Sequence, residues 1–267
     1  MRILAKVGGT LLDAVESRKN ISVQLAALAA QHELVVVHGG GKQLTRYLDE
    51  RGITSKFVRG LRVSDDKVID AATKVIAGTV NKQFAAALLA EGASAIGLSG
   101  VDGALTRVIQ TSAELQFVGS PVESNGALLR LLAEAGYLPV VACLGADRNG
   151  AIYNVNADQM AVSCAVAFNA QKLVFLTDVP GVKDSQGEVM PELQPADVAE
   201  LILSGVAHGG MHAKLDATLM ALRGGIREVA IVSGHEPGVC ARVLQGEGLG
   251  GAIGTRVSLD RSHGATL

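Results

Sequence analysis

The sequence of 267 residues contains no tryptophan, and aromatic residues make up only 3% of it. It also lacks any run rich in lysine or arginine, and its formal net charge is −2. Binding nucleic acid requires clustered basic residues, and binding single strands also uses aromatic rings for stacking. Because neither feature is present, we expect no nucleic acid partner.

Cysteine is scarce as well, with only Cys143, Cys164 and Cys240. Their odd number and wide spacing fit neither a disulfide framework nor a metal site, and the first two lie in apolar runs typical of a core. Lys6 interrupts a first apolar stretch that is too short for a signal peptide, and no window approaches the roughly 18 apolar residues of a membrane span. We therefore expect a soluble, cytoplasmic and reduced protein with no membrane partner.

Hydrophobic residues are plentiful, at 48%, and are arranged as short apolar runs that alternate with longer helical patterns. The runs predict buried strands at 3–7, 33–37, 94–98, 138–142, 172–176 and 228–232. The helical patterns cover 21–31, 68–92, 126–136, 158–170 and 211–225. This alternation predicts an α/β fold with a mostly parallel, doubly wound central sheet.

Three segments break this rhythm and predict inserted β-hairpins: 55–65, 106–124 and 147–156. The last contains Asn149-Gly150 between apolar residues, which is a strong hairpin signal. We expect two lobes with a border near 165–175, so that residues 1–170 form one and residues 171–267 the other.

Two glycine-rich turns follow predicted strands, "KVGGT" at 6–10 and "VHGGGK" at 38–42. In a parallel sheet both turns lie at the carboxyl edge, where ligands bind. Bare backbone N–H groups and a following helix favour an anion such as phosphate. Neither the P-loop nor the dinucleotide fingerprint is matched, and the alternative is two ordinary strand–helix turns.

Several polar residues lie near these turns or at predicted helix starts. Lys6 interrupts an apolar strand, which is costly unless it reaches an anion or solvent. Asp158 opens a helix and is either its N-cap or an anchor for lysines. Asn154 is a candidate ligand donor, and Lys214 sits near a helix start, where the macrodipole disfavours a cation unless it faces an anion.

Two further segments carry polar side chains. Thr177 and Asp178 end a predicted strand and either bind a nucleotide or form an ordinary turn. In "RGLRVSD", Arg62 is suited to bidentate hydrogen bonding with a carboxylate. The alternative is a surface arginine without a binding role. Arg59 is the second choice for that contact.

Taken in order, the segments "KVGGTLLD", "VVVHGGGKQ", "FVRGLRVSD", "AGTVNK", "GLSGVDG", "NVNADQMA", "FLTDVPGV", "GGMHAKLDA" and "IGTR" resemble the amino acid kinase family, and within it the N-acetylglutamate kinases. The resemblance implies a three-layer αβα sandwich, with the acyl amino acid in the N-terminal lobe and ATP in the C-terminal lobe. It implies transfer of the γ-phosphoryl group of MgATP to the side-chain carboxylate of N-acetyl-L-glutamate. The products would be N-acetyl-L-glutamyl 5-phosphate and ADP, in the second step of arginine biosynthesis.

The resemblance also assigns roles by position. Lys6 and Lys214 would stabilise the transition state, with Asp158 orienting both. The substrate contacts would be Gly40, Gly41, Arg62 and Asn154. The phosphate and nucleotide contacts would be Gly8, Gly9, Gly39, Thr177, Asp178, Val179, Pro180, Gly181, Val182, Lys183, Gly210 and Met211.

A carboxylate is already a competent nucleophile, so this reaction requires no general base, and His38 is expected to be structural. We expect Mg²⁺ to be held by the ATP phosphates, with no metal site made by the protein alone. Ser64, where the family more often has threonine, and "GLSGVDG", also found in aminoadipate kinases, leave substrate chain length open. The alternatives are an N-acetyl- or carrier-linked aminoadipate kinase and a non-catalytic nucleotide sensor.

The resemblance further implies a homodimer that pairs two N-terminal lobes, with part of the surface supplied by 68–92. Arginine-inhibited relatives carry an extra helix before the first strand, and here only residues 1–5 precede Lys6. We therefore expect a dimer that arginine does not inhibit.

Overall fold

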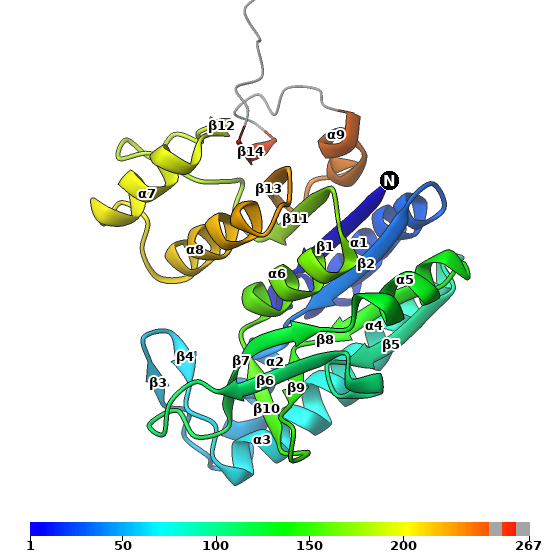
Figure 1. The fold of residues 1–267 in the computed structure, drawn as a ribbon, viewed down its shortest axis with the longest axis vertical. Coiled ribbons are helices and arrows are strands. Elements are labelled where there is room, and N and C mark those ends of the chain that lie inside the picture. The colour runs from blue at the N-terminus through cyan, green and yellow to red at the C-terminus, as the bar shows by residue number, and fades with distance from the viewer. Residues whose placement is uncertain (246–252, 260–267) are drawn as a thin grey trace, which may run out of the picture.

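A computed structural model describes residues 1–245 and 253–259. Its centre is an eight-stranded sheet in the order β12-β14-β13-β11-β1-β2-β8-β5 (Figure 1). These strands are β1 (Arg2–Val7), β2 (Glu33–His38), β5 (Ala95–Ser99), β8 (Leu138–Ala142), β11 (Lys172–Thr177), β12 (Glu192–Leu193), β13 (Glu228–Ser233) and β14 (Gly254–Ser258). All six predicted strands are present within one residue of their expected limits.

The strands that surround the candidate site are parallel. β1 lies between β2 and β11, and β8 lies between β2 and β5, all in parallel register. Within the described sheet only the β13–β14 pair is antiparallel. The carboxyl ends of β1, β2, β8 and β11 therefore meet at one edge, as the sequence predicts.

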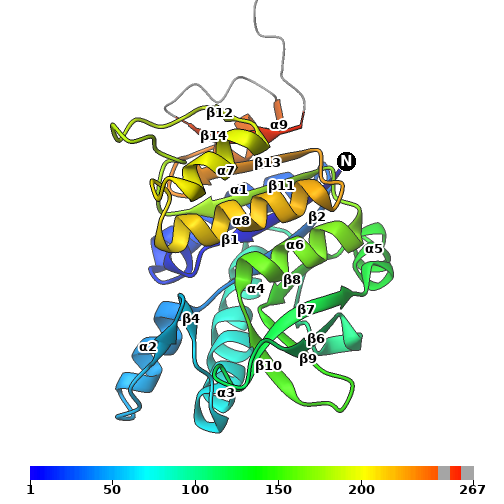
Figure 2. The ribbon, with the colours of Figure 1, turned by 60° about the vertical axis from the view of Figure 1, so that its left-hand side comes forward.

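Helices cover both faces of this sheet, which makes the expected three layers (Figures 1 and 2). On one face α6 packs against β1 and α8, with α5 beside it, and on the other α1 packs against α4 and α9. The helices are α1 (Val15–Ala29), α2 (Gly41–Asp49), α3 (Asp66–Ala72), α4 (Asn81–Ala90), α5 (Gly126–Glu134), α6 (Ala157–Phe168), α7 (Pro195–Leu203), α8 (Gly209–Arg223) and α9 (Val239–Gln245). Short 3₁₀ turns occur at η1 (Gly9–Leu12) and η3 (Asp102–Ala104).

The helical pattern predicted at 68–92 forms one continuous helix whose central part is a π-helix. The π-helix η2 (Thr73–Val80) joins α3 to α4, and the residues at both junctions keep right-handed helical dihedrals. Stretches of π-helix are rare and often occur at functional sites. Here η2 places Ile76 next to the second glycine turn.

The predicted hairpins form separate small sheets. β6 (Thr106–Gln110) and β7 (Val118–Ser124) pair antiparallel, as do β9 (Leu144–Ala146) and β10 (Ile152–Val155), and the four close into a small barrel. β3 (Phe57–Val58) and β4 (Leu61–Arg62) form a third hairpin. Its turn residues, Arg59 and Gly60, both have positive φ, as tight hairpin turns require.

The core is continuous across the expected lobe border. Val35, Val36 and Val37 of β2 are fully buried, as are Leu173 and Phe175 of β11. Because β1 and β11 are hydrogen-bonded neighbours, the division into 1–170 and 171–267 remains a prediction. The second range includes residues 246–252 and 260–267, which lie outside the described part of the chain. None of the helices in the described part is both long and apolar enough to span a membrane.

Candidate active site

One carboxylate joins two lysines that lie 208 residues apart in the sequence. Asp158 Oδ1 is 2.8 Å from Lys6 Nζ, and Asp158 Oδ2 is 3.1 Å from Lys214 Nζ. All three side chains are about nine-tenths buried, with exposed fractions of 9% to 11%. The site therefore contains two buried cations and one buried anion, which leaves a net positive charge.

Three different elements hold these side chains. Lys6 is fixed in the middle of the sheet, where its neighbours across the two ladders are Val37 and Phe175. Lys214 lies in the second turn of α8, near the helix start as expected, with its Nζ 5.1 Å from the centre of the Phe175 ring. Because α6 packs against both β1 and α8, Asp158 reaches both lysines.

The local sequence leaves Asp158 free for this task. Asn156 is the N-cap of α6, and its Oδ1 accepts hydrogen bonds from the backbone N–H of Asp158 at 2.9 Å and of Gln159 at 3.2 Å. The alternative that Asp158 is only an N-cap is therefore wrong. The first turn of a helix also favours a negative charge at this position.

Burial and charge oppose one another at this cluster. Burial alone would raise the pKa of Asp158, but Lys6 and Lys214 outweigh burial and hold that pKa below its ordinary value. The pKa of Lys214 is lowered by burial and by repulsion from Lys6, and Asp158 and Asp178 offset part of that shift. The carboxylate thus stays ionised and keeps two cations close together.

The two glycine turns lie in direct contact beside this cluster. A Cβ on Gly9 would lie 3.2 Å from the Gly40 nitrogen, and a Cβ on Gly40 would lie 3.2 Å from Ile76 Cγ1. Gly8 donates its N–H to the Leu176 carbonyl at 2.9 Å, which ties the first turn to β11. Larger residues at 9 or 40 would push these turns apart.

A cavity of about 260 Å³ opens at this edge of the sheet. Its lining brings together many of the residues predicted for substrate and phosphate: Lys6, Gly9, Gly39, Gly40, Gly41, Arg62 and Asn154. The hairpin residues Phe57, Gly60 and Leu61 line it too. The predicted nucleotide residues from Thr177 to Lys183, with Gly210 and Met211, are not part of this lining.

Arg62 is anchored from several sides at the wall of the cavity. Its Nη2 donates to Thr45 Oγ1 at 2.6 Å and to the Gly41 carbonyl at 3.2 Å, and its Nη1 donates to Ser55 Oγ. Burial lowers the pKa of its guanidinium, and Asp49 offsets part of that effect. Because both Nη2 hydrogens are engaged, a bidentate grip on a ligand would replace one of these contacts.

Asn154 faces the same cavity from β10. Its Nδ2 donates to Ser64 Oγ at 3.3 Å, and Ser64 Oγ donates to the Arg62 carbonyl at 3.0 Å. Ser64 is completely buried. Its hydroxyl links the β3–β4 hairpin to β10, a task that threonine, with the same hydroxyl, also performs.

The predicted nucleotide residues occupy the neighbouring side of the sheet edge, on β11 and α8. Thr177 Oγ1 donates to Asp178 Oδ1 at 3.2 Å, and the Gly234 N–H donates to the Thr177 carbonyl at 2.8 Å. The Val182 N–H donates to Thr255 Oγ1 at 2.8 Å, which ties this loop to β14. The amino end of α8 has no side-chain cap. The Met211 N–H donates to the His208 carbonyl at 3.2 Å, whereas the N–H groups of Gly209 and Gly210 have no acceptor among the described residues and are available to an anion.

Cys143 and His38 lie next to the site without entering its ionic cluster. Cys143 lines the cavity, and burial raises the pKa of its thiol to about 11, so it stays protonated. His38 is fully buried, and burial lowers its pKa to about 4. Sequence reasoning missed Asn81, which contacts His38, because the two positions are 43 residues apart and no periodic pattern connects them.

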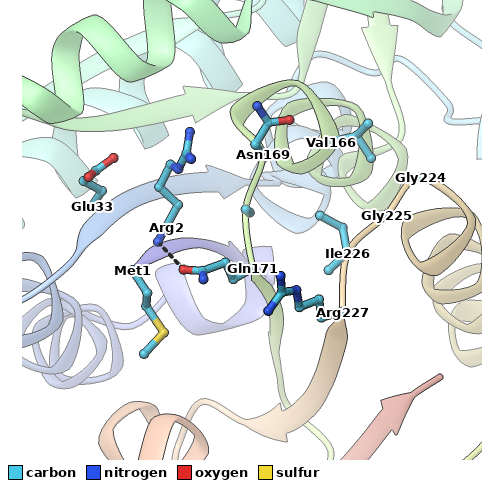
Figure 3. A pocket seen from close by; sticks show the side chains of 11 residues that line it. Met1, Arg2, Glu33, Val166, Asn169, Gln171, Gly224, Gly225, Ile226 and Arg227 are labelled. Atoms are coloured by element: carbon cyan, nitrogen blue, oxygen red, sulfur yellow. Dashed lines mark hydrogen bonds between the residues drawn. The ribbon is translucent and has the colours of Figure 1, made fainter. Parts of the chain in front are cut away.

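A separate cavity of about 580 Å³ lies at the opposite, amino edge of the sheet (Figure 3). Its lining includes Arg2, Gln171, Ile226 and Arg227, and the Arg2 backbone N–H donates to Gln171 Oε1 at 3.2 Å. It contains none of the predicted site residues. Ligands of open α/β sheets bind at the carboxyl ends of the strands, so the smaller cavity is the better candidate.

Comparisons with known proteins agree with this geometry. The acetylglutamate kinase of Solibacter usitatus (strain Ellin6076) is 54% identical over 251 residues, which cover 94% of this chain and 98% of that protein. The acetylglutamate kinase of Methanopyrus kandleri is 41% identical over 238 residues, covering 85% of this chain and 93% of that protein.

Solved structures share the architecture. N-acetylglutamate synthase from Neisseria gonorrhoeae, complexed with coenzyme A and N-acetyl-glutamate, has a TM-score of 0.84 at 26% identity. The match covers 98% of this chain but spans only 60% of the synthase. Carbamate kinase from Giardia lamblia, bound to AMP-PNP, has a TM-score of 0.71 at 15% identity, covering 97% of this chain and 98% of that one, and shows the shared fold alone. The amino acid kinase family model matches residues 1–233, and with relatives this similar the chain belongs to the amino acid kinase family.

Proposed function

We propose that this chain is an acetylglutamate kinase, which transfers the γ-phosphoryl group of ATP to the side-chain carboxylate of N-acetyl-L-glutamate in arginine biosynthesis. A carboxylate oxygen attacks the γ-phosphorus, and the bond from phosphorus to the bridging oxygen breaks with its electron pair leaving on ADP. The product is the acyl phosphate N-acetyl-L-glutamyl 5-phosphate. The observation that carries this proposal is the buried Lys6–Asp158–Lys214 cluster, whose Lys6 lines a cavity together with Arg62 and Asn154.

Phosphoryl transfer requires alignment of the reactants and neutralisation of charge on the transferring oxygens. Lys6 and Lys214 supply two cations whose positions are set before substrates arrive, because Asp158 holds both. Backbone N–H groups of the glycine turns supply further donors. No side chain has to remove a proton, because the attacking carboxylate is already ionised at neutral pH.

We assign the acyl amino acid to the cavity wall formed by Arg62 and Asn154. Arg62 would bind the α-carboxylate and Asn154 a polar group of the substrate. The β3–β4 hairpin, which contributes Phe57, Gly60 and Leu61 to the lining, would cover the bound substrate and exclude water. The volume of about 260 Å³ suits a small acyl amino acid.

The nucleotide would lie on the β11 and α8 side, along Thr177 to Lys183 and over the amino end of α8. This arrangement supports an N-terminal lobe that binds the acyl amino acid and a C-terminal lobe that binds ATP. We propose that Mg²⁺ is held by the ATP phosphates. Among the described residues no group of three or more His, Cys, Asp or Glu side chains is placed to hold a metal ion by itself.

A panel of acceptors tests the proposal. Trapping the acyl phosphate with hydroxylamine in the presence of MgATP should give a hydroxamate with N-acetyl-L-glutamate. N-acetyl-L-aminoadipate, one methylene longer, should react at least about 10-fold more slowly, because one misplaced methylene is worth roughly 1–3 kcal/mol. Free L-glutamate, which lacks the acetyl group, should also react more slowly. Preference for the longer substrate would favour the aminoadipate kinase, and no turnover with any acceptor would favour the nucleotide sensor.

We further propose that the chain works as a homodimer in the cytoplasm, where ATP is available. β5 is the terminal strand of the described eight-stranded sheet, and Leu89 on the adjacent helix α4 is 54% exposed. Pairing two β5 edges about a two-fold axis would extend the sheet and bury that side chain.

A further inference from the structure

A buried histidine and a buried asparagine lie behind the second glycine turn. His38 is the last residue of β2, and Asn81 is the first residue of α4. His38 Nδ1 lies 2.9 Å from the Gly39 carbonyl oxygen, and His38 Nε2 lies 2.9 Å from Asn81 Nδ2. Both side chains are completely buried, and the ring of Phe84 packs edge-on against the imidazole at 6.0 Å.

The hydrogen-bond partners determine the tautomer of His38. A carbonyl oxygen only accepts, so the proton must lie on Nδ1. Asn81 Nδ2 is also 2.8 Å from the Val140 carbonyl and 3.2 Å from the Leu98 carbonyl, so the amide is oriented with its donor toward these acceptors. Of the three acceptors near the two Nδ2 hydrogens, the Val140 carbonyl and His38 Nε2 are the nearest, so His38 Nε2 accepts from Asn81. Burial lowers the pKa of His38 to about 4, which keeps the ring neutral.

The position of Asn81 lowers the stability of the folded protein. Its Oδ1 is buried, and among the described residues it has no hydrogen-bond partner, which is destabilising. A Cβ on Gly97 of β5 would lie only 2.2 Å from that oxygen, so the strand leaves room for the amide by having glycine there. An arrangement that tolerates an unsatisfied group indicates that the Asn81 donor serves a purpose.

The hydrogen bond from His38 sets the direction of one peptide group. The described backbone has no cis peptide, so the Gly39 carbonyl and the Gly40 N–H point in opposite directions. Since the carbonyl points back to His38, the Gly40 N–H points away from His38, and Gly40 itself lines the cavity together with Lys6. Among the described residues none accepts a hydrogen bond from this N–H.

We propose that His38 and Asn81 are positioning residues, which hold the Gly39–Gly40 peptide so that the Gly40 N–H faces the transferring phosphoryl group. A peptide between two glycines meets little steric resistance to rotation, so an external restraint is needed to fix it. A donor fixed in advance stabilises the transition state without reorganisation. This inference rests on the proposed kinase reaction and adds to it the restraint that orients one of its donors.

Two isosteric variants separate this role from a structural one. In His38→Asn the side-chain amide reaches the place of Nδ1 and can still donate to the Gly39 carbonyl. In His38→Gln the amide reaches the place of Nε2, which keeps the contact with Asn81 and loses the one with Gly39. Ser22→Ala, which removes a buried hydroxyl that bonds to the Arg18 carbonyl in α1, is a control for loss of stability alone.

We expect His38→Asn to keep kcat within about 10-fold of the unmodified protein, and His38→Gln to lose about 100-fold, the size of effect seen when an aligned donor is lost. KM for ATP should change little in both variants, and Ser22→Ala should lower Tm without changing kcat. Equal losses of kcat in the two His38 variants, in proportion to Tm, would overturn the proposal.

Nitrogen NMR of the unmodified protein provides a test that needs no variant to fold. At pH 7.5 the His38 ring should carry its proton on Nδ1, with Nε2 unprotonated. A proton on Nε2, or a doubly protonated ring, would contradict the proposal. Absence of acyl phosphate formation by the unmodified protein would instead overturn the kinase function and leave the tautomer result unaffected.

Discussion

At the scale of single residues, Asp158 sets the charge arrangement of the site, because it pairs with both lysines. Two lysines held near one another in a buried position repel each other, and the carboxylate that pairs with both offsets that repulsion. Removing one partner of such a buried group costs about 3–5 kcal/mol, because the remaining charges are left uncompensated. The cluster is therefore a poor source of stability and a good way to present two cations to an incoming phosphate.

Arg62 is expected to act on binding more than on the chemical step. Arg62→Lys should raise KM for N-acetyl-L-glutamate by about 10-fold or more, because a single ammonium cannot replace the planar guanidinium fork. The same change at Arg59, an exposed turn residue, is the matched control. Steady-state kinetics measures both, and an unchanged KM in Arg62→Lys would place the α-carboxylate contact elsewhere.

His38 should make the protein sensitive to mild acid. Its pKa is about 4 in the folded chain and about 6.5 when unfolded, so below pH 6.5 the unfolded state binds the extra proton first. Stability is then lost as pH falls from 6.5 to 4, by up to about 3 kcal/mol from this group.

Urea unfolding at pH 7 and at pH 4.5 measures this loss. It should be smaller in His38→Asn, whereas His235→Asn, which changes an exposed histidine, should behave as the unmodified protein does. The same pH dependence in His38→Asn would show that other groups cause the acid sensitivity.

At the scale of elements, the π-helix η2 and the glycine turn before α2 fit one another. A Cβ at Gly40 would lie 3.2 Å from Ile76 Cγ1, so Gly40→Ala should displace the turn and lower kcat by about 10-fold or more. Ile76→Ala removes both γ-carbons from that contact and should restore part of the loss.

A double-mutant cycle on kcat tests this contact. Ile76→Ala alone measures the cost of the smaller side chain, and the double variant should be more active than the product of the two single effects predicts. Strict additivity would show that the turn and the π-helix are independent.

The strands and most helices follow from the sequence because burial on both faces and helical periodicity are local signals. Helix α7 was not predicted, although Pro195 at its start and the reciprocal capping by Gln194 and Asp197 are recognisable signals. The start of α1 at Val15 was also missed, since its first turns are mainly polar. The π-helix has no comparable signal, because its wide turn depends on packing against distant residues.

The arrangement of the candidate site is harder to predict from the sequence than the strands and helices are. The local sequence identifies Lys6 and Lys214 separately as candidates for contact with an anion. Only the family resemblance predicts that the two side chains meet, because strand order cannot be read from local patterns. The closing of four hairpin strands into a barrel and the pairing of His38 with Asn81 both depend on contacts between remote parts of the chain.

At the scale of the whole molecule, the free edge of β5 is the proposed dimer contact. Leu89→Glu combined with Ile96→Lys places charges on α4 and β5 and should convert a dimer into a monomer in light scattering. Leu203→Glu is the control, since Leu203 of α7 is 87% exposed and lies on the other half of the sheet. A dimer mass that survives the paired change would place the interface on another surface.

The central claim is that the two buried lysines stabilise the transition state of phosphoryl transfer. Its most direct test measures kcat and the Kd for ATP in Lys6→Met and Lys214→Met, with Lys172→Met as the control. Lys172 is paired with Glu228 at 2.9 Å, at the amino edge of the sheet. We predict that kcat falls on the order of 10²–10³-fold in the first two variants, with Kd for ATP within a few-fold of its original value, and that the control keeps its kcat. Near-normal kcat in either site variant, or a loss explained entirely by weaker ATP binding, would contradict the account.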